Sequence, residues 1–181
     1  MPKENPGKDP YPLIVTLQFD KEAQDYFNTL RKLHFPPEIN YLDAHTTLFH
    51  HLPSDEPFIS KELLKIAVRS AFYIRVTAVN CTGNGVALAL EAKKIQEMHA
   101  RLQKVFGQWL IPQDTHTIKP HVTIQNKVSA ATAKELSLQL QKDFVPFSVR
   151  AIGINTWLYK NGPWDHVVFY PFSETDKISS S

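Results

Sequence analysis

Cysteine is almost absent from this sequence of 181 residues, in which Cys81 is the single one. A lone cysteine cannot form an intrachain disulfide, which excludes a disulfide-stapled fold and favours a reducing compartment. We therefore expect a cytoplasmic protein, with the nucleus as the alternative. Long apolar runs are also missing, since none approaches the ~20 residues of a membrane-spanning helix. The N-terminal stretch "MPKENPGKDPYP" lacks the apolar segment of a signal peptide, so we expect neither membrane insertion nor secretion.

A strong excess of positive or negative charge is missing as well. The 20 Lys and Arg residues against 18 Asp and Glu residues give a formal net charge of +2. This weak excess does not indicate a protein that binds long duplexes, but it is compatible with an anionic substrate held at one spot. Hydrophobic residues make up 43% of the chain, and the length fits one domain or two small lobes that share a cleft. We expect a monomer without an obligate protein partner.

Two hydrophobic periodicities alternate along the chain in an order that repeats. A period of two predicts strands, and apolar positions three and four apart predict helices. Asp20 and Ser129 stand where helix caps are expected. The predicted strands cover residues 13–20, 44–51, 72–81, 86–92, 119–127, 147–160 and 164–172, and the predicted helices cover residues 21–33, 60–71, 93–110 and 129–144.

The repeated order predicts an α+β fold with two pseudo-symmetric lobes. Each lobe is expected to be an antiparallel-rich sheet with helices packed on its outside, and the two lobes form a central cleft. By chain order, the lobes cover about residues 11–83 and 84–172 of one bilobal domain. Residues 1–10 are expected to form a flexible arm, and residues 173–181 a flexible tail.

Each half of the chain carries one His-x-Thr triplet on its second predicted strand, at residues 45–47 and 121–123. Because successive side chains of a strand point to opposite faces, the His and the Thr of each triplet share a face. Where the two strands face each other across the cleft, two imidazoles and two hydroxyls surround one small volume. The same alternation adds Phe49, His51, Gln125 and Lys127 to the cleft face.

Two imidazoles and two hydroxyls suit the cleavage of a phosphodiester without a metal or another cofactor. In-line cleavage of a P–O bond needs a base on one side of phosphorus and an acid on the other. The ordinary histidine pKa of about 6.5 allows one ring to be neutral and the other charged near neutral pH. Hydroxyl groups can donate to the non-bridging oxygens, where negative charge sits in the transition state. The pattern therefore favours acid–base catalysis at phosphorus.

The stretches "AHTTLFHHLP" and "KPHVTIQNK", with "WLYKNGPWDHVVFYPF" near the end, resemble the 2H phosphoesterase superfamily. This group includes the 2′-5′ RNA ligase-like proteins and the cyclic phosphodiesterases, and the resemblance covers about residues 11–172. It implies a bilobal fold and metal-independent hydrolysis or transfer at 2′,3′-cyclic phosphates or 2′-5′ linkages of RNA 3′ ends or small nucleotides. It also implies that His45 and His121 are the acid–base pair and that Thr47 and Thr123 clamp the phosphate.

Four further residues are predicted to contact the substrate. Phe49 is expected to stack on a base, with packing between the lobes as the alternative, and Tyr159 has the same two options. His51 is expected at the rim of the cleft, unless it only shapes the end of the strand. Many relatives carry a basic residue directly after the second motif. This chain has Asn126 and Lys127 there, so Lys127 is the expected contact to phosphate.

Three alternatives stand beside this function: a metal site, a ligase and a binding module. A metal site would use His45 and His51, but six residues along a strand span ~20 Å, and no Glu or Cys stands at ligand spacing near the second motif. We therefore expect no metal. A 2′-5′ ligase would use the same four residues with an RNA hydroxyl in place of water. A nucleotide- or RNA-end-binding module is the alternative from another class, although binding alone does not require two titrating imidazoles.

Overall fold

The structure, a computed structural model, describes residues 11–173, so the predicted arm at residues 1–10 and the predicted tail beyond residue 173 lie outside the described residues. Seven strands form one antiparallel sheet, with four α-helices in the described range. No helix of this range is long and apolar enough to cross a membrane. The strands are β1 (Leu13–Phe19), β2 (Thr46–Leu52), β3 (Phe72–Cys81), β4 (Val86–Glu91), β5 (His121–Gln125), β6 (Phe147–Tyr159) and β7 (Trp164–Pro171), and the helices are α1 (Lys21–His34), α2 (Pro57–Ile66), α3 (Lys93–Phe106) and α4 (Ala130–Asp143).

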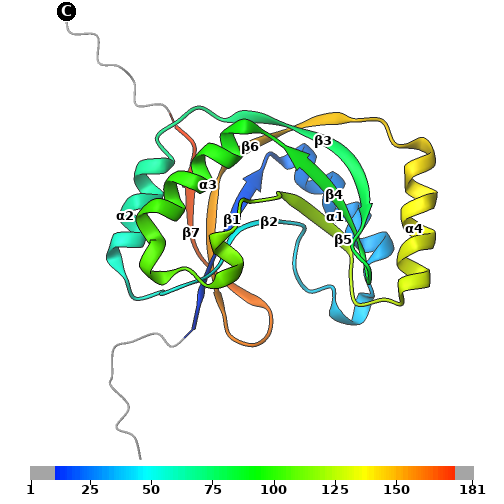
Figure 1. Cartoon of the computed structure of the whole chain (residues 1–181), viewed down its shortest axis with the longest axis horizontal. Helices are drawn as coiled ribbons and strands as arrows, with labels where there is room; N and C mark the ends of the chain where they lie inside the picture. Colours follow the sequence, from blue (N-terminus) through cyan, green and yellow to red (C-terminus); the bar gives the residue numbers. More distant parts are fainter. Residues whose placement is uncertain (1–10, 174–181) are drawn as a thin grey trace, which may run out of the picture.

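The order of the strands places the two His-x-Thr strands at opposite ends of the sheet. The path runs β2-β1-β6-β3-β4-β5, and β7 pairs with β6. On each side of the β6–β3 pair, the outermost strand follows its neighbour in the chain through one helix, as β1-α1-β2 and as β4-α3-β5. Figure 1 shows the sheet curved into an arch, with α2 and α3 outside one limb and α4 outside the other. The predicted α+β fold with two similar lobes is thereby confirmed.

Each half of the sheet contains one strand from the other half of the chain. β6, from the C-terminal part, pairs with β1, and β3, from the N-terminal part, pairs with β4. The turn between β3 and β4 is closed by a hydrogen bond from Thr82 N–H to Gly85 O at 2.9 Å, and Gly83 in this turn has a φ of 91°. The predicted boundary between the lobes, residues 83 and 84, therefore lies inside a hairpin. Dividing the chain there does not separate the two halves of the sheet.

Helix α1 connects the hydrophobic core to β5. Asp20 caps its first turn, as predicted, by accepting a hydrogen bond from Ala23 N–H at 3.1 Å. Phe27 is fully buried and meets Phe19 of β1 edge to face, with ring centroids 5.1 Å apart. One turn further along, Arg31 is only 5% exposed and reaches the backbone of β5. The helix thus holds the two ends of the curved sheet near each other.

Some boundaries differ from the predictions. α2 begins at Pro57 instead of Ser60, because Glu56 accepts a hydrogen bond from Phe58 N–H at 3.2 Å and proline suits the first helical position. The predicted helix over residues 93–110 ends earlier, in a 3-10 turn over Gly107–Trp109. The two motif strands are also shorter than predicted at their starts, so that His45 immediately precedes β2 and His121 opens β5.

Candidate active site

His45 and His121 are held in the same way at the starts of the two end strands. Nδ1 of His45 lies 2.8 Å from the carbonyl oxygen of Asp43, and Nδ1 of His121 lies 2.9 Å from the carbonyl oxygen of Lys119. Because a carbonyl oxygen only accepts, each Nδ1 carries the hydrogen, and Nε2 of each ring is left for a ligand. Two strands from different halves of the sheet therefore each hold a histidine with its Nε2 available to a ligand.

Thr46 joins the two motifs directly. Its Oγ1 donates to the carbonyl oxygen of His121 at 2.9 Å, and the residue is 1% exposed. β2 and β5 are not neighbours in the sheet, so this bond connects two strands that share no backbone pairing. Thr46 is the middle residue of the first triplet, and sequence reasoning gave it no role because its side chain was expected on the other face.

The Thr46→Val substitution tests this link between the strands. We expect it to lower the free energy of unfolding by about 1–3 kcal/mol, because the carbonyl oxygen of His121 loses its donor while the shape of the buried side chain is kept. Chemical denaturation in urea measures the change. Thr77→Val, at a half-buried position on β3, is the matched control and is expected to change stability by less than about 0.5 kcal/mol. Equal changes in the two variants would show that Thr46 does not bridge the motifs.

Arg31 provides a second connection between the strands. Its Nη1 donates to the carbonyl oxygen of Thr123 at 2.9 Å, and its Nε donates to Asn40 Oδ1 at 3.0 Å and to the carbonyl oxygen of Leu42 at 3.1 Å. Burial lowers the pKa of Arg31, and the nearby charge of Asp43 opposes the shift. One guanidinium thus fixes both the segment before β2 and the second motif itself.

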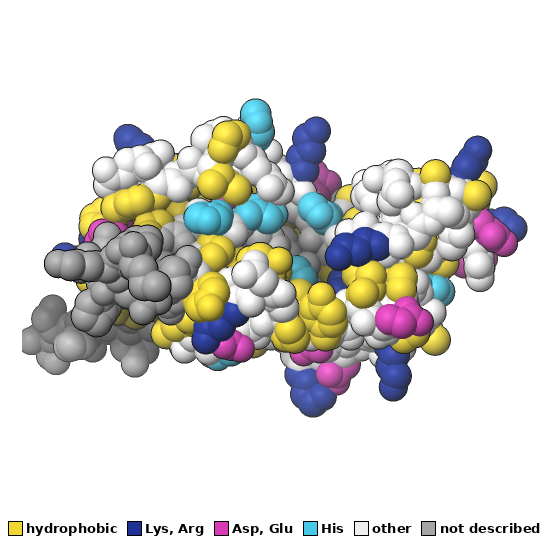
Figure 2. All heavy atoms as spheres, turned by 90° about the horizontal axis from the view of Figure 1, so that it is seen from below, with side chains coloured by type: hydrophobic (Ala, Val, Ile, Leu, Met, Phe, Trp, Pro, Cys, Tyr) yellow, Lys and Arg dark blue, Asp and Glu magenta, His cyan; other side chains and the backbone are white. Residues whose placement is uncertain are grey.

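The four predicted catalytic residues, His45, Thr47, His121 and Thr123, line one groove with a volume of about 490 Å³. Figure 2 shows histidine side chains gathered along a hollow on this face of the molecule. The motif residues come from the two ends of the sheet, so the curvature of the sheet forms the groove. Within residues 11–173, no three His, Cys, Asp or Glu side chains are grouped so that they could hold a metal ion.

Phe49 does not reach the groove. It is fully buried, stacks on His99 with ring centroids 4.7 Å apart, and meets Phe106 edge to face at 5.6 Å. His99 is itself 3% exposed, and its Nε2 lies 3.0 Å from the carbonyl oxygen of Leu48. The prediction that Phe49 stacks on a base is therefore wrong, and its alternative as a packing residue holds.

An irregular register in β2 explains the position of Phe49. Thr47 pairs with Thr16 of β1, whereas Phe49 pairs with the adjacent Val15, so β2 contains one extra residue, Leu48, between the two pairs. An extra residue of this kind is a β-bulge, and it reverses the alternation of side chains beyond it. The prediction of side-chain direction from strict alternation along β2 therefore holds only as far as Thr47.

His50 faces the groove as a result of this bulge. Its backbone N–H donates to Asp114 Oδ2 at 2.8 Å, and its ring Nδ1 lies 2.7 Å from Asp114 Oδ1. Asp114 belongs to a 3-10 turn (Pro112–Thr115), and Gln103 of α3 fastens this turn by donating to the carbonyl oxygens of Asp114 and His116, both at 2.8 Å. Sequence reasoning missed the pair, because Asp114 lies 64 residues away in a segment without periodicity.

The remaining three predicted contacts lie outside the lining of the groove. His51 and Lys127 are exposed, and Lys127 follows β5 with a φ of 58°. Tyr159 is 39% exposed at the end of β6, and its cross-strand partner there is Trp164 of β7. Trp164 does line the groove. The roles of His51, Lys127 and Tyr159 as substrate contacts stay predictions.

Trp164 packs over the ring of His45, with ring centroids 4.7 Å apart and an angle of 51° between the planes. Burial lowers the pKa of His45 to about 4. The positive charges of Arg31 and of two neighbouring histidines act in the same direction, whereas the backbone hydrogen bond of the ring opposes them. His45 is therefore neutral near neutral pH. Trp164 lies in the stretch that resembles the superfamily near the C-terminal end, but the sequence pattern gave this residue no role.

A change in pH dependence follows from this packing. A base with a pKa of about 4 stays unprotonated well below the ordinary histidine value, so we expect kcat/KM to fall only as the pH approaches 4. Trp164→Ala admits water to the ring, and we expect the acid limb of the profile to move up toward the ordinary value of about 6.5. Phe169→Ala removes an exposed aromatic ring of the same hairpin that does not line the groove, and it should leave the limb in place. An unmoved limb in Trp164→Ala would contradict the role of this tryptophan.

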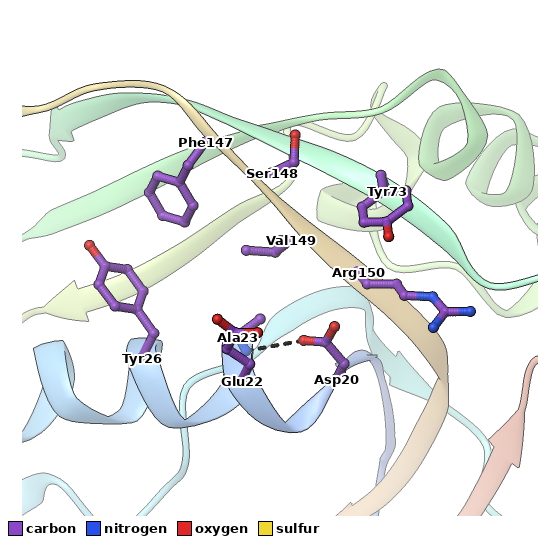
Figure 3. Close-up of a pocket in the computed structure, with 9 residues that line it drawn as sticks. All are labelled: Asp20, Glu22, Ala23, Tyr26, Tyr73, Phe147, Ser148, Val149 and Arg150. Carbon is purple, nitrogen blue, oxygen red and sulfur yellow. Dashed lines mark hydrogen bonds between the residues drawn. The ribbon is translucent and has the colours of Figure 1, made fainter.

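A second hollow lies at the start of α1 and differs in character (Figure 3). Its volume is about 490 Å³, and its walls come from α1, β3 and β6. Asp20 and Glu22 contribute carboxylates to it, and Tyr26 meets Phe147 edge to face at 5.3 Å. No histidine is among the described residues that line this hollow, so neither motif histidine reaches it.

Comparison with known families agrees with this geometry. The model of the 2′-5′ RNA ligase superfamily matches residues 19–163. The chain therefore belongs to the 2′-5′ RNA ligase superfamily, one of the 2H phosphoesterases that its motifs resemble. No curated protein matches the chain.

Several solved structures share the fold. Escherichia coli LigT in complex with 3′-AMP has a TM-score of 0.59 at 14% identity, covering 92% of this chain and 100% of that chain. The protein TT0787 of Thermus thermophilus has a TM-score of 0.58 at 14% identity, covering 90% and 98%. A further structure, described as a phosphoesterase, has a TM-score of 0.57 at 13% identity, covering 92% and 100%. At these identities the likeness shows the fold alone.

Proposed function

We propose that the protein is a metal-independent phosphodiesterase that acts on 2′,3′-cyclic phosphates or 2′-5′ phosphodiester bonds of RNA ends or small nucleotides. The observation that carries the proposal is the pair of identically held imidazoles, from opposite ends of the sheet, in one groove with two threonines. Membership of the superfamily supports phosphoesterase or ligase-like chemistry. Structures of the similar E. coli LigT with 3′-AMP and with ATP support nucleotides as the class of substrate.

Hydrolysis of a cyclic phosphate requires a proton transfer on each side of phosphorus. The neutral His45 takes a proton from water through Nε2 while the water oxygen bonds to phosphorus. The bond from phosphorus to the 2′ or 3′ oxygen breaks, and His121 gives this oxygen the proton of its Nε2. A phosphomonoester and a free hydroxyl result, and exchange with solvent restores the two rings. Thr47 and Thr123 donate to the non-bridging oxygens as their charge grows.

Ligation of 2′-5′ linkages is the second candidate, and a neighbouring hollow favours it. This hollow has a volume of about 270 Å³ and shares His45 and Trp164 with the groove. Tyr41 and Trp157 also line it, and flat aromatic rings of this kind stack on bases. A second nucleoside placed there would bring a hydroxyl to the position of the attacking water.

Turnover assays separate the candidate functions. The purified protein is incubated in EDTA with nucleoside 2′,3′-cyclic monophosphates or with a 2′-5′-linked dinucleotide, and the products are resolved by chromatography. We expect phosphomonoesters to form in EDTA. Joining of RNA ends would identify the ligase instead. Turnover that EDTA abolishes would contradict the metal-independent mechanism, and tight nucleotide binding without any turnover would identify a binding module.

A further inference from the structure

A buried carboxylate positions His50, which distinguishes it from both motif histidines. Both oxygens of Asp114 are used by this one residue, at 2.8 Å and 2.7 Å. The side chain of Asp114 is 2% exposed, whereas that of His50 is 42% exposed. Because Nδ1 is committed to the carboxylate, Nε2 is the atom that the ring presents to a ligand, and Gln113 places its amide nitrogen 3.2 Å from it.

The groove continues past the two motifs toward this ring. The groove is also lined by residues of the segment 113–119, which include His116 and Lys119. Asp114 is the one carboxylate among the described residues that line the groove, and its oxygens are taken by His50. The groove therefore offers hydrogen-bond donors and positive charge beyond the two motifs, which suits a further anionic group of a ligand.

The spacing along β2 separates His50 from the phosphorus at the motifs. His50 follows Thr47 by three residues with the bulge at Leu48 between them, so the two lie less than the ~10 Å of a fully extended strand apart along β2. An imidazole at this distance meets another anionic group of the same ligand, and does not share in the clamp formed by the two threonines. The mechanism above uses neither His50 nor Asp114.

We propose that His50, held by Asp114 and assisted by Lys119, binds a second phosphate of the substrate. This proposal rests on the proposed phosphodiesterase function and specifies its substrate class. The preferred substrate is a nucleoside 2′,3′-cyclic phosphate that also carries a phosphate on its 5′ oxygen, as the last nucleotide of an RNA chain does. When this phosphate binds, it replaces the Gln113 amide at Nε2, and the ring takes up a proton from solvent there, so that Nε2 donates to the phosphate while Nδ1 donates to the carboxylate.

Paired substrates test the proposal. Adenosine 2′,3′-cyclic monophosphate is compared with the same nucleotide carrying a 5′-phosphate. For the unmodified protein we expect kcat/KM to be about 10–100-fold higher with the 5′-phosphate, mostly through KM, as for one charge-assisted hydrogen bond. In His50→Gln this ratio is expected to fall close to 1, and in Lys119→Ala, which changes an exposed side chain, it should fall several-fold. His34→Gln is the control, because His34 ends helix α1 and does not line the groove, and it should keep the ratio of the unmodified protein.

The outcomes distinguish this proposal from the proposed function. A ratio near 1 in the unmodified protein, or a ratio that persists in both His50→Gln and Lys119→Ala, would overturn the second phosphate site while leaving the phosphodiesterase intact. If neither substrate is turned over, the proposed function fails. Calorimetric affinities for adenosine and adenosine 5′-monophosphate then give the same comparison by binding. A preference for the phosphate that His50→Gln removes would still support the site.

Discussion

Replacement of His45 or His121 by asparagine is expected to lower kcat by about 10²–10⁴-fold, the contribution typical of one general acid or base. Asparagine keeps a side-chain N–H that can donate to the carbonyl oxygen now bonded to Nδ1, so the backbone of both strands has its partner while the titrating nitrogen is lost. The double variant is expected to be little slower than either single one, because the acid and the base act in the same step and their effects are not additive.

Steady-state kinetics on a 2′,3′-cyclic nucleotide measures these losses, and circular dichroism with thermal melting checks that each variant is folded. His34→Asn is the control, since His34 ends helix α1 and does not line the groove. We expect this variant to retain the activity of the unmodified protein. Losses below tenfold in both folded motif variants would mean that the imidazoles are not the acid and the base.

Valine at Thr47 or Thr123 is expected to lower kcat by about 10²–10³-fold at each position, the cost of removing one donor to a charge that develops in the transition state. Valine matches threonine in shape, so the loss reports on the hydroxyl. Because the hydrogen bond strengthens as charge builds, kcat should fall by more than KM rises. Serine at the same positions keeps the hydroxyl and is expected to stay within about tenfold of the unmodified protein. Serine variants as slow as the valine variants would show that the hydroxyl does not act on the phosphate.

The sequence predicted the part of the site that depends on short-range geometry. His45 and Thr47 are two residues apart, and so are His121 and Thr123, and within so short a distance the alternation of a strand holds. The structure places these four side chains in one groove. The same alternation failed at Phe49, because the extra residue Leu48 shifts the register between them. Periodicity cannot reveal a bulge that only the pairing with β1 defines.

The rest of the site depends on contacts between distant segments. Thr46 meets His121 because the sheet curves until its two end strands approach each other, and no local pattern encodes this curvature. Asp114 meets His50 through an irregular turn after α3, and Trp164 meets His45 because the β6–β7 hairpin folds over the first motif. The exchange of β3 and β6 between the halves of the sheet was also hidden, since sequence order does not fix strand order.

A crystal structure of the protein with sulfate or a 3′-nucleotide tests the central claim most directly. We expect one tetrahedral anion in the groove, with Nε2 of His45 and Nε2 of His121 both within about 3.2 Å of its oxygens and on opposite sides of its central atom. The hydroxyls of Thr47 and Thr123 should contact the remaining oxygens. An anion that binds to only one of the two rings, or that binds outside the groove while the groove stays accessible, would contradict the account.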